Sequence, residues 1–473
     1  MEPVDTLTIV QSAARLDDPH VLSDFRDRRS LLGAIFEALV QPDEHGDYAP
    51  LLAERWECAA DARTWTFTLH DGVRFHHGEP LRAADVVASL EHAIDPATGG
   101  ELGTQGVYRS YLAGGAITAI DDRTVRIITP APLADLLDLL TDIPVAPAHA
   151  CSRLVEEPIG TGPYCVESVA PGEVTMRAFD DYRGALPPAQ RLVWRGEPDA
   201  ARRVAALADG SADIVADVPP GHRAELAAQG YLLAERPASL CVIFMCNCFS
   251  GPCTDARVRQ ALNYALDIDA LIAAASPGAR PLNGPLTPLH LGYDPATPAY
   301  PHDPARARAL LADAGYGSGL TLTMDVPAIH PDEAPLLAEV MAAHYAQVGV
   351  HVDVRQHEDR PAYADMVRAR RFGDLCCFDS SPMSSYRVLR EKIDSRLPGP
   401  WWEGYHNAAV NALIDEAAAT LDRGARMASY RRAYRLIRDD APWVFLYHPT
   451  LAWGIGPRAR GWQPSRDGRI RVR

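Results

Sequence analysis

A strand–helix–strand pattern occurs twice in this chain, and it constrains the fold more than any other feature of the sequence. The first unit comprises a strand at 192–195, a helix at 199–207 and a strand at 210–216. The second comprises a strand at 320–324, a helix at 333–348 and a strand at 350–354. Because a helical crossover connects strands that run parallel, both units predict parallel pairing. The sequence therefore predicts an α/β protein.

Other elements are expected on either side of these units. Further strands are expected at 6–11, 64–69, 123–128 and 443–447, and helices near 30–40, at 81–93 and across 410–440. The cluster of Pro, Gly and Thr at 158–164 predicts a rigid turn that leads into a strand. Asp303, Pro304 and Gly315 have the residue types that cap, begin and end a helix.

The length and charge of the chain limit its organisation and its partners. With 473 residues it is too long for one compact core, so two or three lobes are expected. The formal net charge is −16 and basic residues form no long block, which argues against nucleic-acid binding. No run of about 18 apolar residues occurs, so no membrane-spanning helix is expected.

Enzyme motifs do not occur in the sequence. It has no nucleophile elbow, phosphate loop, zinc-protease motif or dinucleotide fingerprint. We therefore predict no catalytic residues, no cofactor and no metal bound by the protein's own side chains. His76-His77 lies in an expected turn, where a structural role outweighs metal binding. A metal that arrives as an organic chelate is still possible.

Nine cysteines leave the redox state open, because an odd number cannot all pair within the chain. Cys246 and Cys248 would share one face of a strand, where a thiol usually acts as a small hydrophobe. We expect buried structural cysteines, with a disulfide through Cys248 or Cys253, or a metal site, as the alternatives. The first ten residues contain no basic region and no apolar region of a signal peptide. We expect a periplasmic or cell-surface location if a signal peptide has been removed, and a cytoplasmic one if not.

Five stretches, in order along the chain, resemble the peptide- and nickel-type solute-binding proteins of ABC importers (family 5, cluster C). They are Tyr48-Ala-Pro-Leu-Leu-Ala-Glu-Arg-Trp-Glu57, residues 64–90 with Asp71-Gly-Val-Arg-Phe-His-His-Gly78, Gly160-Thr-Gly-Pro-Tyr164, and residues 254–267 and 303–316. The resemblance covers nearly the whole chain. The sequence departs from the family at His77, where an aspartate is usual.

The resemblance implies a periplasmic-binding-protein-like clam shell with two α/β lobes, hinge crossings and an extra inserted lobe. The lobes would comprise residues 1–38, 165–240 and 448–473 (lobe I), 39–164 (inserted lobe) and 241–447 (lobe II, closing over the ligand). The implied function is capture of a small organic ligand, such as a short peptide, an opine-like conjugate or a metal chelate. The closed, monomeric receptor would deliver it to a membrane permease. The alternative is a cytosolic sensor or accessory protein that reuses this fold.

The resemblance also suggests where the ligand binds. In peptide receptors an aspartate that pairs with the ligand's amine stands at the position of Phe378, whereas here Asp379 follows one step later, so its direction in an extended segment would be reversed. Aromatic residues with polar edges suit small-ligand pockets, and arginine binds carboxylates as a fork. The candidate ligand-binding residues are Arg29, Tyr108, Arg109, Tyr111, Phe244, Cys246, Asn247, Phe378, Asp379, Ser380, Ser384, Tyr386, Arg387, Trp401, Trp402, Tyr405 and His406.

Overall fold

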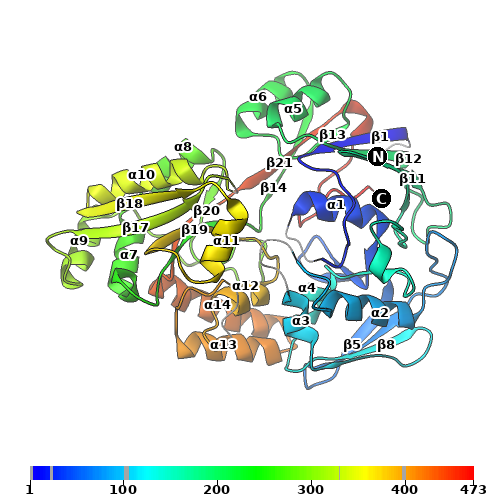
Figure 1. Ribbon diagram of the computed structural model, residues 1–473, viewed down its shortest axis with the longest axis horizontal. Coiled ribbons are helices and arrows are strands. Elements are labelled where there is room, and N and C mark those ends of the chain that lie inside the picture. Colours follow the sequence, from blue (N-terminus) through cyan, green and yellow to red (C-terminus); the bar gives the residue numbers. More distant parts are fainter. Residues whose placement is uncertain (1–3, 22–24, 101–105, 330, 397–400, 473) are drawn as a thin grey trace. The chain divides into compact units, whose positions relative to one another are not determined.

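The protein consists of two compact units (Figure 1). The computed structural model describes residues 4–21, 25–100, 106–329, 331–396 and 401–472. Unit 1 comprises Met1–Arg236 and Leu451–Arg473, and unit 2 comprises Pro237–Thr450. The chain therefore passes between the units twice. The finer division of the chain into three lobes stays a prediction.

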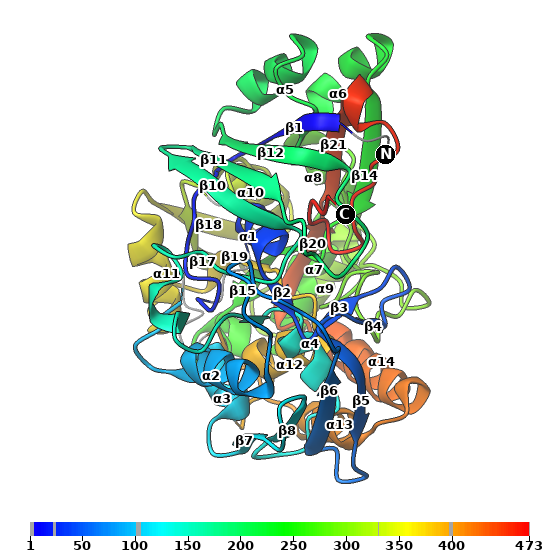
Figure 2. The ribbon, with the colours of Figure 1, turned by 90° about the vertical axis from the view of Figure 1, so that its right-hand side faces the viewer.

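Unit 1 is built on a seven-stranded mixed sheet. In spatial order its strands are β10 (Tyr164–Ala170), β11 (Glu173–Ala178), β12 (Ala189–Gly196), β1 (Val4–Gln11), β13 (Ile214–Val215), β21 (Thr450–Ile455) and β14 (Leu232–Pro237). Figure 2 shows the first four of these strands side by side. β12 and β13 both pair with β1 in parallel. The first strand–helix–strand unit therefore has the parallel arrangement that the sequence predicts.

Helices cover both faces of this sheet. Side chains of β1 alternate between the two faces, so the strand contributes to a core on each side. Leu7 and Ile9 pack with Leu31 and Ile35 of α1 (Arg26–Ile35). Val10, on the opposite face, belongs to a core that α5 and α6 complete. These helices span Ala200–Ala208 and Pro220–Ala228. The sheet is therefore buried on both sides, as is usual for strands joined by helical crossovers.

The remainder of unit 1 lies between α1 and β10 in the sequence. Its main sheet is antiparallel, in the order β5 (Ala53–Cys58), β6 (Thr64–Leu69), β8 (Thr124–Ile128) and β7 (Ala116–Ala119). Two short pairs join β2 (Glu37–Ala38) to β9 (Pro144–Val145), and β3 (Val40–Pro42) to β4 (Tyr48–Pro50). The helices of this part are α2 (Ala83–Ile94), α3 (Val107–Leu112) and α4 (Leu136–Leu140), with a 3₁₀ turn at Cys151–Arg153.

The turn at 158–164 packs directly against the last turn of α1. The Gly162 N–H donates to the Ile35 carbonyl at 2.8 Å. A Cβ on Gly160 would lie 2.0 Å from that same oxygen, so only glycine fits there. The sequence predicted a helix near 30–40, but α1 ends at Ile35 and Phe36 is extended. The apolar run that follows α1 is buried in the short strands β2 and β3 instead, which explains the incorrect boundary.

His76 joins the same turn through both ring nitrogens. Nε2 lies 3.0 Å from the Gly162 carbonyl, to which it donates, and Nδ1 accepts the Gly160 N–H at 3.3 Å. Both contacts require the neutral ring, and burial lowers the pKa of His76 to about 4. The neutral form is therefore favoured in the folded protein. The stability that this provides is complete above about pH 6.5 and is lost as the pH falls toward 4.

We expect unit 1 to lose up to about 3 kcal/mol of stability through His76 between pH 6.5 and pH 4. The substitution His76→Gln removes the titrating group, so the variant should show a weaker acid dependence in urea unfolding. His45→Gln, at an exposed position of the same unit, is the control. An equal acid dependence of His76→Gln and wild type would contradict this account.

Unit 2 contains a six-stranded mixed sheet. In spatial order its strands are β16 (Arg280–Pro281), β20 (Trp443–His448), β15 (Cys241–Cys246), β19 (Leu375–Ser380), β17 (Leu320–Pro327) and β18 (Val350–His357). β17 and β18 pair in parallel through α10 (Ala334–Ala346), which confirms the second strand–helix–strand unit. Gly349, at φ +82°, takes the left-handed conformation between α10 and β18.

Unit 2 contains further helices, one of which has the predicted cap. They are α7 (Ala256–Tyr264), α8 (Ile268–Ala275), α9 (Pro304–Asp313), α11 (Arg360–Arg368), α12 (Ser385–Lys392), α13 (Ala408–Ala419) and α14 (Arg423–Asp440), and Pro252–Thr254 forms a 3₁₀ turn. Asp303 accepts the Arg306 N–H at 2.9 Å and Pro304 stands in the first turn of α9, as the sequence predicted. α13 and α14 pack side by side at the lower left of Figure 1.

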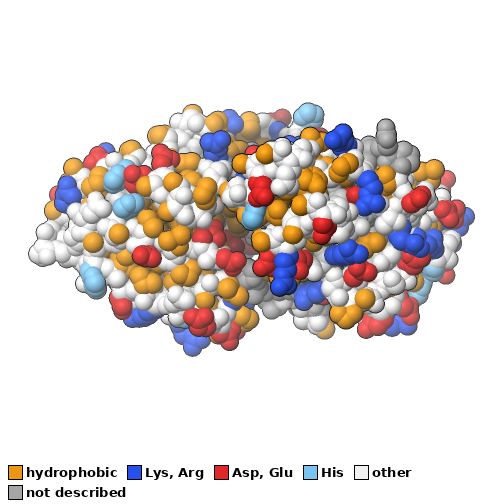
Figure 3. All heavy atoms as spheres, turned by 90° about the horizontal axis from the view of Figure 1, so that it is seen from above, with side chains coloured by type: hydrophobic (Ala, Val, Ile, Leu, Met, Phe, Trp, Pro, Cys, Tyr) orange, Lys and Arg blue, Asp and Glu red, His pale blue; other side chains and the backbone are white. Residues whose placement is uncertain are grey.

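The cysteines are free thiols, and most are buried. Burial raises the pKa of Cys246 and of Cys376 well above the ordinary value for a thiol. Such thiols are poor nucleophiles and pack as small hydrophobes. No helix within the described ranges is long and apolar enough to cross a bilayer. Acidic and basic side chains are interspersed on the face shown in Figure 3.

Candidate functional site

A pocket in unit 1 is lined by basic residues from distant parts of the chain. Its volume is about 70 Å³, which is room for roughly five water molecules or one polar group of a larger ligand. It is lined by Pro19, Val21, Arg28, Arg29, Leu32, Gly33, Phe36, Ala38, Tyr108, Thr141, Asp142, Pro144 and Arg469. These residues come from the loop after β1, from α1 and β2, from α3, from the approach to β9 and from the C-terminal segment. We call it the arginine pocket.

One face of α1 forms the main wall of this pocket. Arg29, Leu32, Gly33 and Phe36 recur at spacings of three and four residues, which places them along one side of a helix. A Cβ built on Gly33 would meet no atom within 4 Å, so the space in front of it is open. The helix therefore leaves a gap between one cationic side chain and two apolar ones.

Asp142 holds two arginines in fixed positions. One of its carboxylate oxygens lies 2.9 Å from Nη2 of Arg29, and the other lies 2.5 Å from Nη2 of Arg469. The Tyr108 hydroxyl donates to the Asp142 carbonyl at 2.8 Å. Burial opposes the charged form of Arg469. The negative charges of Asp467 and Asp142 outweigh this effect and raise the pKa of Arg469 above its ordinary value. Asp142 thus orients both guanidinium groups before any ligand arrives.

The charges of the lining favour an anionic group. Three arginines and one aspartate line the pocket, although two aspartates outside the lining offset part of this excess: Asp467 lies 3.1 Å from Nε of Arg469, and Asp17 lies 3.4 Å from Nε of Arg28. A guanidinium carries five N–H donors, so one arginine can bind Asp142 and a ligand carboxylate together. Such charge-assisted hydrogen bonds are strong where water is largely excluded. The pocket is suited to a carboxylate.

Of the four candidate residues in unit 1, two line the arginine pocket and two do not. Arg29 and Tyr108 both line the arginine pocket. Tyr111 is buried on α3 without lining it, and Arg109 is exposed on the same helix. Sequence reasoning missed Asp142 and Arg469. Arg469 lies in no motif, and it contacts Asp142 although the two residues are 327 positions apart in the sequence.

In unit 2, strand pairing directs the candidates to two opposite faces of the sheet. Residues directly paired across β15 and β19 share a face. Asp379 pairs with Val242 and Phe244 pairs with Cys377, so these four residues lie on the same face. Phe378 and Ser380 point to the other face, because neighbouring residues alternate along a strand. Phe244, Cys246, Phe378 and Ser380 are buried, and Asp379 is half-buried.

Other unit 2 candidates make local contacts. The Asn247 side chain donates to the Gly373 carbonyl at 3.0 Å and accepts the Phe249 N–H at 3.1 Å. Ser384 caps α12, on which Tyr386 is buried. Arg387 pairs with Glu391 at 2.9 Å.

The segment 401–406 is held by similar local contacts. Trp401 is buried, and its ring centroid lies 4.5 Å from that of Phe378. Trp402 donates to the Tyr405 carbonyl at 2.7 Å, and the Tyr405 hydroxyl donates to Asp440 at 2.5 Å. His406 is exposed and lies 2.6 Å from the Ser395 hydroxyl.

Comparisons with known proteins agree on one family. The family model for bacterial extracellular solute-binding proteins, family 5, matches residues 47–375. The glutathione-binding protein GsiB of Pectobacterium atrosepticum is 28% identical, covering 98% of this chain and 92% of that protein. The heme-binding protein A of Haemophilus influenzae is also 28% identical, covering 89% and 83%.

The fold matches as well. The solved structure of HbpA2 from Haemophilus parasuis superposes with a TM-score of 0.84 at 23% identity, covering 98% of both chains. This likeness confirms the expected α/β periplasmic-binding-protein-like fold.

Proposed function

Because the chain belongs to the bacterial extracellular solute-binding proteins of family 5, we propose that it captures an organic anion through a carboxylate bound in the arginine pocket. Proteins of this family are non-catalytic binding receptors of ABC transporters. The ligand class, its site and the delivery of the ligand to a permease are the parts that we propose. We also propose a periplasmic or cell-surface location, and a ligand-dependent shift to a closed form that docks on the permease.

One observation carries the ligand class: Asp142 orients Arg29 and Arg469 side by side in a wall that also contains Arg28. The names of the relatives agree with it. Glutathione and heme differ in shape, but both carry carboxylates. A short peptide, an opine-like conjugate or an organic metal chelate also carries one. A pocket of about 70 Å³ would take this shared group and leave the rest of the ligand to other contacts.

The test begins with native mass spectrometry of the purified protein, to detect any ligand that copurifies. Thermal-shift assays then compare glutathione, dipeptides, opines and heme with their carboxyl esters. We expect an acid to raise the melting temperature where its ester does not. If no acid binds, or if esters bind equally well, the proposal is wrong.

A pair of arginine variants tests the location. Arg29→Met should weaken binding of the acid found in that screen by about 10- to 100-fold, because it removes a charge-assisted hydrogen bond. Arg109→Met, at the exposed position on α3, is the matched control and should bind as wild type does. Isothermal titration calorimetry measures both. The reverse pattern would place the ligand elsewhere.

A further inference from the structure

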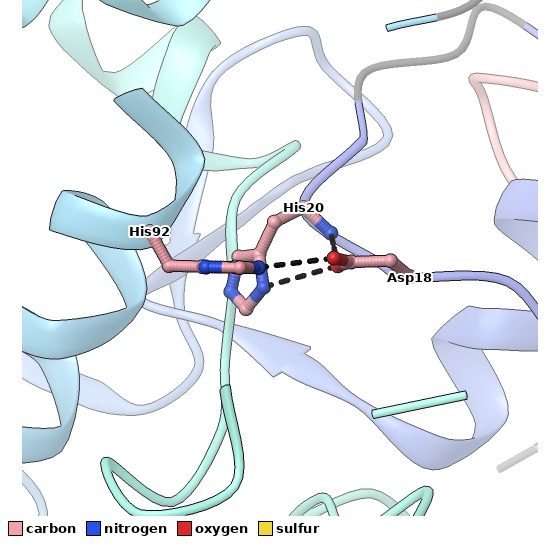
Figure 4. A group of neighbouring side chains, drawn as sticks. All are labelled: Asp18, His20 and His92. Atoms are coloured by element: carbon pink, nitrogen blue, oxygen red, sulfur yellow. Dashed lines mark hydrogen bonds and ion pairs between the residues drawn. The ribbon is translucent and has the colours of Figure 1, made fainter. Parts of the chain in front are cut away.

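A second group of polar side chains lies near the arginine pocket but does not line it. Asp18 and His20 belong to the loop after β1, and His92 belongs to the last turn of α2 (Figure 4). Oδ2 of Asp18 lies 3.0 Å from Nε2 of His92, and Oδ1 lies 3.4 Å from Nδ1 of His20. The potential ligand atoms of the three residues all lie within 4.8 Å of one another.

The tautomer of His20 is fixed by the backbone. Its Nε2 lies 2.9 Å from the Pro144 carbonyl, which can only accept, so Nε2 carries the proton. In the neutral ring, Nδ1 is then a lone pair directed at the Asp18 carboxylate. The His20 side chain is fully buried, and Nδ1 has no hydrogen-bond partner among the residues that the structure describes. A lone pair and a carboxylate repel each other at this distance. The contact therefore requires a positive charge, either between the two groups or on one of them.

We propose that Asp18, His20 and His92 bind a divalent transition-metal ion such as Zn²⁺. Two imidazoles and a carboxylate are ligands that this class of ion prefers. Bonds of 2.0–2.2 Å in a tetrahedron place ligand atoms about 3.4 Å apart. The Asp18–His20 separation of 3.4 Å matches this value, and the Asp18–His92 separation of 3.0 Å is shorter and corresponds to a hydrogen bond. The contact of His20 with the Pro144 carbonyl is the outer contact that typically orients a metal-binding histidine.

The loop is already shaped for this role. The carboxylate of Asp18 accepts a hydrogen bond from the backbone N–H of His20 at 2.8 Å, which holds both side chains on the same side of the turn. Asp18 and His92 remain about one-fifth exposed, so water can complete the coordination.

The metal would also anchor one wall of the arginine pocket. Asp18 and His20 alternate along the loop with Pro19 and Val21, which line the pocket, as does Pro144. An ion that joins this loop to α2 would therefore hold that wall in place. The proposed metal site consists of the side chains of Asp18, His20 and His92. It does not depend on whether a small-molecule carboxylate binds in the arginine pocket.

The test uses the full-length protein after removal of metal with a chelator. We expect calorimetry with ZnCl₂ to show a tight site, and Co²⁺ to give the visible absorption of nitrogen and oxygen ligands without a sulfur charge-transfer band. Asp18→Asn and His92→Gln should each weaken Zn²⁺ binding by more than about 10-fold and remove the Zn²⁺-dependent rise in melting temperature. Circular dichroism checks that both variants fold.

The matched control is His149→Gln. His149 lies in unit 1 with His77 and Glu79 in an exposed group of similar composition. The control should bind Zn²⁺ as wild type does. The proposal is overturned if apo protein does not bind Zn²⁺, if binding is lost in His149→Gln and retained in His92→Gln, or if Co²⁺ reports thiolate ligands. In the first case the contact between Asp18 and His20 is structural only.

Discussion

Replacement of Gly33 by leucine is expected to weaken ligand binding by about 100-fold, or ~3 kcal/mol, without loss of stability. Gly33 lines the arginine pocket, and a Cβ at this position would meet no atom within 4 Å. The new side chain therefore enters the space proposed for the ligand and not the protein core. Leucine also favours the helix over glycine by roughly 0.5–1 kcal/mol, so the melting temperature should not fall.

Gly221→Leu separates the two effects. Gly221 also lies in a helix, α6, and a Cβ there would likewise meet no atom within 4 Å, but it does not line the pocket. We expect this variant to keep the affinity of wild type for the acid found in the screen, as measured by calorimetry. If Gly33→Leu binds that acid with unchanged affinity, the ligand does not enter the arginine pocket.

The substitution Glu403→Gln is expected to stabilise unit 2 increasingly as the pH rises from about 4.5 to 7. Glu403 is fully buried, and neither carboxyl oxygen has a hydrogen-bond partner within the described part of the chain. Burial raises its pKa well above the ordinary value, although Arg259 and Lys392 act in the opposite direction. The folded protein holds this group protonated where the unfolded chain ionises it.

The sign and size follow from linkage. Above pH 4.5 wild type loses up to about 1.4 kcal/mol per pH unit through Glu403, until the raised pKa is reached. The glutamine variant has no such loss, so its advantage at pH 7 is at most about 3 kcal/mol and disappears below pH 4.5. Urea unfolding at several pH values measures it, with Glu339→Gln at an exposed position of α10 as the control. A difference that does not vary with pH would show that Glu403 is ionised in the folded protein.

The fold was predictable because its signals are local. Both strand–helix–strand units form parallel pairs, since a strand, a helical crossover and a returning strand are each encoded within about 35 residues. The strand at Thr64–Leu69 has the predicted bounds, because its side chains alternate between half-buried and buried. α1 was misplaced where an apolar run continued beyond the helix and was buried by tertiary contacts.

The pockets were not predictable in the same way. Arg29 and Tyr108 were suggested by the resemblance, but Asp142 and Arg469 meet only through the tertiary fold. Asp18 and His92 are 74 residues apart, and neither lies in a metal-binding motif. Alternation along a strand did predict that Asp379 and Phe378 point to opposite faces.

Lys392, which is buried and donates to the Asp379 carbonyl at 2.8 Å, is the only lysine among 46 basic residues. Every exposed cationic side chain of fixed charge is therefore an arginine. Guanidinium groups keep their charge at any pH that a protein survives, and they are not substrates for acetylation or other amine modification. The positive half of this protein's surface charge is thus insensitive to alkaline conditions and to amine-modifying chemistry.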